Sequence, residues 1–165
     1  MPDFDQVGTI DFFRERHRVE STTTAKVLSA IPADMLSYRP HSGSTTAGTT
    51  AWTILRCLHV ANHLPHSDST EVPRTHHPDH EGLLAEFHRG VESLQQELSS
   101  LNQADWVKER TVISNGVAIL RQPLGQILWL FFFDGIHHRG QLSTYLRPMG
   151  AAVPSIYGPS ADTTA

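Results

Sequence analysis

Asp134 and His138 are the two residues whose types and spacing most clearly indicate chemistry. They stand four positions apart, and side chains at i and i+4 lie on one face of a helix, about 6 Å from each other. A carboxylate and an imidazole at that spacing can converge on one divalent cation. The structural alternative is a hydrogen-bonded Asp134–His138 pair, or a contact of the carboxylate with Arg139 or an arginine of another helix.

The segment that carries this pair is expected to form one long helix over residues 123–147. Pro123 suits the first helical position because its missing N–H would have no partner there, and Gly150 helps to end the helix. At helical spacing, Asp134 and His138 replace two core residues, and a buried carboxylate needs a cation or hydrogen-bond donors. The expected core stripe is Leu124, Ile127, Phe131, Asp134, Gly135, His138, Leu142 and Tyr145.

Three more helices are expected before this one, from apolar residues that recur every three or four positions. The first covers about residues 8–31, the second starts at Thr49 or Thr50 as N-cap and ends at Pro65, and the third follows Asp79 as N-cap. In the first helix the expected inward residues are Phe12, Val19, Val27 and Ile31.

The stretch 106–120 breaks the helical pattern with β-branched residues around Asn115-Gly116. This pair suits turns with positive φ, so a short hairpin or extended segment is expected before the last helix. The predicted fold class is therefore all-α, a four-helix bundle. A length of 165 residues fits one domain spanning residues 1–165.

Composition excludes several classes of protein. A net charge of −4 disfavours a nucleic-acid partner, which would require a concentrated basic surface. One cysteine cannot form an intramolecular disulfide, which favours a cytoplasmic location. The longest apolar run, residues 127–133, is too short to cross a membrane, and the N-terminus has no export signal. Catalytic triads and phosphate-binding fingerprints are also missing.

The run Phe-Asp-Gly-Ile-His-His-Arg-Gly-Gln-Leu-Ser-Thr-Tyr-Leu-Arg-Pro-Met-Gly at residues 133–150, followed by Val-Pro-Ser-Ile-Tyr-Gly-Pro-Ser at 153–160, resembles the C-terminal signature of the DinB/YfiT-like metalloenzymes. Tyr38-Arg39-Pro40 and Ala51-Trp52 resemble landmarks of that family more loosely. The resemblance implies a four-helix bundle, commonly a homodimer. It also implies a divalent metal held by one histidine of the second helix and two of the fourth, with water in the open position.

Two ligand positions depart from the family pattern. His138 matches the second histidine of the H-x-x-x-H pair, but the first falls on Asp134. In the second helix one register places Cys57 at the ligand position and another places Thr53 there, while His59 is a further alternative. A Cys57 thiolate would complete a Cys/Asp/His set suited to Zn²⁺, with Ni²⁺ or Mn²⁺ as alternatives. Otherwise Cys57 is a small buried apolar residue.

The remaining histidines are expected to play lesser roles. His59, His63 and His66 recur on the second helix as a solvated face, and His76, His77 and His80 lie in or beside a loop. His137 stands 100° around the helix from His138, so it is expected to support the site or lie at an interface.

By this resemblance, the expected function is a metal-dependent enzyme that activates water or a low-molecular-weight thiol for hydrolysis, transfer or isomerisation of a small molecule. Arg139 or a loop histidine would orient the substrate. Two alternatives stay open: a metal-free, dimeric binding module in which the site has decayed, and a protein whose many histidines sequester metals.

Overall fold

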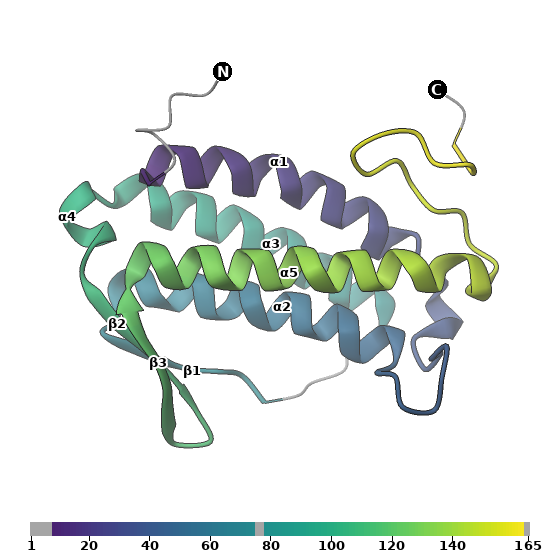
Figure 1. Ribbon diagram of the computed structural model, residues 1–165, viewed down its shortest axis with the longest axis horizontal. Helices are drawn as coiled ribbons and strands as arrows, with labels where there is room; N and C mark the ends of the chain where they lie inside the picture. The colour runs from purple at the N-terminus through teal and green to yellow at the C-terminus, as the bar shows by residue number, and fades with distance from the viewer. Residues whose placement is uncertain (1–7, 75–77, 164–165) are drawn as a thin grey trace.

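The computed structural model describes residues 8–74 and 78–163, and four long helices dominate it. They are α1 (Ile10–Ser29), α2 (Ala47–His63), α3 (His80–Ser100) and α5 (Leu124–Leu146). Figure 1 shows them side by side with nearly parallel axes. α5 packs mainly against α2, and α1 packs against both α3 and α5. The bundle predicted from the periodicity is thus present, and it places the middle of α5 beside the middle of α2.

Short elements connect the long helices. A one-turn helix, α4 (Gln103–Trp106), precedes the sheet, and 3-10 turns occur at Ala33–Met35 (η2), Leu64–His66 (η3) and Arg147–Met149 (η4). After η4 the chain folds back toward α1 (Figure 1). In the described part of the chain, no helix is long and apolar enough to cross a membrane.

Side-chain caps explain where the helices begin. The Asp79 carboxylate accepts from the Gly82 backbone N–H at 2.7 Å, which confirms the predicted start of α3. The Thr46 hydroxyl accepts from the Thr49 N–H at 3.1 Å, so the N-cap of α2 lies three or four residues before the predicted Thr49 or Thr50. Several threonines in a row could each serve as a cap, and the sequence alone did not distinguish them.

A small sheet makes the all-α prediction incomplete. β2 (Glu109–Ser114) and β3 (Val117–Pro123) form an antiparallel hairpin, and β1 (Ser69–Glu71) adds to β2 in parallel. The hairpin turns at Asn115 and Gly116 with φ of 52° and 76°, as their residue types predicted. β1 was missed because three residues of loop composition carry no periodic signal.

The inward faces of α1 and α5 differ from the predicted stripes. On α1, Phe13 and His17 are buried whereas Phe12 and Val19 are only half-buried. The buried face of this helix includes polar residues, which a search for apolar positions passes over; its members are Ile10, Phe13, His17, Ser21, Thr24, Val27 and Leu28. On α5 the innermost polar residue is Arg139, at 1% exposure.

Candidate functional site

Asp134 joins α2 to α5 through two contacts. The Cys57 thiol donates to Asp134 Oδ2 at 3.3 Å, and His138 Nε2 lies 3.5 Å from Asp134 Oδ1. The contact between α2 and α5 therefore brings together the three residues predicted as metal ligands, with the carboxylate in the middle.

The predicted burial of this pair is wrong in degree. The Asp134 side chain is 47% exposed and that of His138 is 23% exposed. The physical reason is the rotation of α5, which turns Arg139 into the bundle and leaves Asp134 and His138 at its margin with α2. Half-exposure lowers the desolvation cost of the carboxylate and leaves one side of the site open to solvent.

Cys57 lies deeper than its two neighbours, at 6% exposure. Burial raises the pKa of its thiol strongly, and the charge of Asp134 and the hydrogen bond to it raise the pKa further. The thiol is therefore protonated at neutral pH and is no nucleophile by itself.

A chain of hydrogen bonds fixes the His138 imidazole. His138 Nδ1 lies 3.2 Å from Gln141 Oε1, and Gln141 Nε2 donates to the Tyr145 hydroxyl at 3.0 Å. That hydroxyl reaches the Thr45 carbonyl oxygen at 3.4 Å. An amide oxygen only accepts, so Nδ1 carries a proton and Nε2 is the ring nitrogen that faces Asp134. A lone pair facing a carboxylate is unfavourable unless a proton or a cation lies between them.

The alternative ligands of α2 lie elsewhere. His59 Nε2 pairs with Glu86 Oε1 of α3 at 2.8 Å, and the Thr53 hydroxyl donates to the Thr49 carbonyl at 3.0 Å. Of the three residues weighed for this position, Cys57 is the one in contact with Asp134.

The other histidines have separate surroundings. His63 contacts the His59 carbonyl, His66 pairs with Glu97, and His80 reaches the Leu28 carbonyl at 3.1 Å. His137 is exposed, and its ring packs edge-to-face on His138 with centroids 5.1 Å apart, in line with a supporting role. His76 and His77 lie outside the described residues.

Arg139 is not placed to orient a substrate, because its guanidinium is buried and engaged. It donates to Glu20 Oε2 at 2.6 Å and to the Tyr157 hydroxyl at 2.6 Å, and the Tyr157 hydroxyl also donates to Glu20 Oε2 at 2.9 Å. The Arg139 carbon Cζ lies 5.2 Å from the centre of the Tyr157 ring. This cluster ties α1, α5 and the C-terminal segment together.

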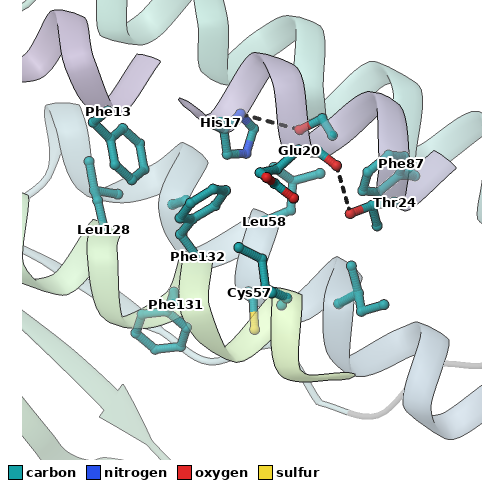
Figure 2. Close-up of a pocket in the computed structure, with 15 residues that line it drawn as sticks. Phe13, His17, Glu20, Thr24, Cys57, Leu58, Phe87, Leu128, Phe131 and Phe132 are labelled. Carbon is teal, nitrogen blue, oxygen red and sulfur yellow. Dashed lines mark hydrogen bonds between the residues drawn. The ribbon is translucent and has the colours of Figure 1, made fainter. Parts of the chain in front are cut away.

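A small pocket of about 50 Å³ opens between the helices next to this site. Figure 2 shows phenylalanine rings from α1, α3 and α5 around it, with Cys57 on α2 and His17 and Glu20 on α1. Cys57 therefore borders the pocket and also contacts Asp134. The sequence analysis missed His17 and Glu20. The helical spacing of Phe13, His17, Ser21 and Thr24 would have indicated that His17 lies on the inward face of α1.

The three predicted ligands fit a metal by donor type, and Cys57 and His138 each lie at ligand-like distance from a different oxygen of Asp134. Ligands around tetrahedral zinc stand about 3.3–3.5 Å apart for bonds of about 2.0–2.3 Å, close to the 3.3 and 3.5 Å found here. Gln141 holds the proton of His138 on Nδ1, the usual support of a metal-binding imidazole. However, within residues 8–74 and 78–163 no three His, Cys, Asp or Glu side chains are arranged around a common centre. Instead, Cys57 donates a hydrogen bond to Asp134, and His138 lies within ion-pair distance of the same carboxylate.

Comparison with known proteins agrees with this fold. The model of the DinB family matches residues 5–165, and the chain belongs to that family. It is 24% identical over 156 residues to the uncharacterized protein YrdA of Bacillus subtilis (strain 168), covering 92% of this chain and 90% of YrdA.

Solved structures share the fold. A DinB-like protein from Bacillus cereus ATCC 10987 matches with a TM-score of 0.75 at 22% identity, over 90% of this chain and 98% of that one. The DinB-like protein YjoA of Bacillus subtilis matches with a TM-score of 0.70 at 19% identity, over 90% and 99%. A mycothiol-dependent maleylpyruvate isomerase matches with a TM-score of 0.60 at 13% identity, over 94% of this chain and 68% of the isomerase.

Proposed function

We propose that this protein is a divalent-metal-dependent enzyme, with Asp134, His138 and Cys57 as ligands, that activates water or a low-molecular-weight thiol to act on a small molecule. The observation that carries the proposal is the Asp134 carboxylate in contact with both the thiol of α2 and the imidazole of α5. The fold shared with a mycothiol-dependent isomerase supports a thiol-related reaction.

Each residue has a defined task in this proposal. His138 Nε2 and an Asp134 oxygen hold the ion from α5, and Gln141 keeps the lone pair of Nε2 available. Cys57 binds as thiolate, so its proton must leave when the ion enters. A bound zinc ion would act as Lewis acid and lower the pKa of a coordinated water or thiol.

The half-exposed position of Asp134 suits an enzyme, because the open side leaves room for water or substrate. A homodimer is part of the proposal, supported by the exposed apolar side chains Leu130 and Phe133 on the outer face of α5.

Elemental analysis of protein purified without a histidine tag tests the metal. About one Zn, Ni or Mn per chain is expected, with loss of the ion in Asp134→Asn and His138→Gln. His63→Gln, which removes an exposed histidine of α2, is the matched control and is expected to keep the ion. Several weakly bound ions that survive both site substitutions would instead support metal sequestration.

A second measurement isolates Cys57. Metal titration in weak buffer is expected to release about one proton per chain from the wild type beyond that released by Cys57→Ser. With Co²⁺, a thiolate charge-transfer band is expected in the wild type and not in the serine variant. If no ion binds under any supplementation, the metalloenzyme proposal fails. Asp134 and His138 would then be a polar pair in the metal-free binding module.

A further inference from the structure

His17 occupies a buried position in the middle of α1, at 7% exposure, where it lines the pocket. Its ring stacks on Phe13 with centroids 5.9 Å apart and lies 5.7 Å from the Phe132 ring. Ser21 Oγ is 3.4 Å and Gln95 Nε2 is 3.3 Å from Nδ1. An imidazole in such apolar surroundings needs partners for both nitrogens, and these contacts serve only one of them.

The contacts of Gln95 determine which nitrogen of His17 carries the proton. Gln95 Nε2 also donates to the carbonyl oxygen of Arg14 at 3.3 Å, which fixes the orientation of the amide group. The amide nitrogen only donates, so His17 Nδ1 must accept. Burial lowers the pKa of His17 to about 4, which keeps the ring neutral at neutral pH. The single ring proton therefore resides on Nε2.

The Nε2–H group points into the pocket. Figure 2 shows Nδ1 of His17 engaged with its neighbour on α1 while the second ring nitrogen faces the space between the helices. Among residues 8–74 and 78–163, the hydrogen bonds of the His17 ring both involve Nδ1 and none involves Nε2. The nearby Glu20 carboxylate binds Arg139 and Tyr157 instead. A ring N–H that forms no hydrogen bond and borders a pocket with mostly apolar walls is a group with which a small bound molecule can pair.

We propose that this pocket binds a small, neutral, apolar molecule with a carbonyl oxygen that accepts a hydrogen bond from His17 Nε2–H. The walls are mostly aromatic and aliphatic and offer a ligand its apolar surroundings. In the described part of the chain no Lys or Arg lines the pocket, and nearby Arg139 is already paired with Glu20, so the pocket offers an anion no free positive charge. A neutral imidazole provides no compensating charge. The site requires no metal and goes beyond the proposed function.

The first test determines the ring proton and the ligand class in the full-length protein. ¹⁵N NMR of the histidine rings is expected to show His17 protonated on Nε2 alone. Three matched probes follow: acetophenone, its alkene counterpart α-methylstyrene, and benzoate. Acetophenone is expected to shift the Nε2 resonance and to bind roughly 2- to 10-fold more tightly than α-methylstyrene, the range for one neutral hydrogen bond. Benzoate is expected to bind more weakly than either.

Variants then connect this preference to His17. His17→Phe is expected to abolish the preference for the ketone over the alkene. Gln95→Met removes the donor that holds the tautomer, and is expected to give a mixture of tautomers and a smaller preference. Asp134→Asn, which removes a proposed metal ligand, is expected to keep the preference, so a failure of the metal proposal is distinguishable from a failure of this one. A proton on Nδ1, equal affinity for ketone and alkene, or no binding of any probe would overturn the inference.

Discussion

Protonation of His17 is expected to destabilise the protein as the pH falls. Burial lowers the pKa of this imidazole to about 4, against the ordinary value of 6.5. Between these two values the unfolded chain binds a proton that the folded chain excludes, so the free energy of unfolding decreases as the pH decreases. The stability is fully present above pH 6.5 and the loss is complete below about pH 4. A difference of about 2.5 between the two pKa values corresponds to about 3 kcal/mol.

Urea unfolding between pH 4 and 7.5 measures this effect, with His17→Phe as the comparison. The carboxylates of the chain also titrate toward the lower end of this range, and the difference between wild type and variant removes their common contribution. The wild type is expected to lose about 1.4 kcal/mol per pH unit more than the variant between the two pKa values of His17. Parallel pH profiles of the two proteins would refute the reasoning, since His17 would then be as easily protonated in the folded as in the unfolded chain.

Three other predictions concern packing, charge and thiol reactivity. Gly125→Ala is expected to lower the free energy of unfolding, measured with urea, by about 2 kcal/mol, because its Cβ would lie 2.3 Å from the Trp106 ring. Gly140→Ala on the same helix would place its Cβ in open space, so the same assay is expected to show a free energy of unfolding raised by about 0.5–1 kcal/mol. Arg139→Met is expected to cost about 3 kcal/mol in the same assay, because it leaves a mostly buried carboxylate unpaired. Cys57 is expected to react with iodoacetamide at least ~10-fold more slowly in the native than in the unfolded protein, because burial raises its pKa; equal rates by mass spectrometry would contradict this.

Local signals in the sequence predicted much of the fold. Asp79 as a cap and Asn115-Gly116 as a turn each act through their own backbone neighbours, so their roles could be deduced from residue type alone. The parallel pairing of β1 with β2 joins Ser69 to Thr111, which stand far apart in the chain. No local pattern specifies a contact of that kind.

The proximity of Asp134, His138 and Cys57 was predictable from the sequence, but the exposure of Asp134 and His138 was not. One-turn spacing placed Asp134 beside His138, and the family register suggested Cys57, which the structure brings into contact with Asp134; binding of a metal by these residues stays a prediction. The apolar stripe did not reveal that α5 is rotated toward Arg139, because a long charged side chain enters a core only where another element supplies its partner. That partner, Glu20, lies on a helix more than a hundred residues earlier.

Tyr157 belongs to the C-terminal segment, yet its hydroxyl donates to Glu20 of α1 and accepts from Arg139 of α5. The Arg139 guanidinium also lies over its ring. The C-terminal segment therefore packs on the outside of the bundle and connects α1 to α5 through Tyr157. Displacement of this segment would expose the Arg139–Glu20 ion pair beside the pocket to water. The surroundings of Glu20 in the pocket wall therefore depend on Tyr157, which lies outside the four long helices.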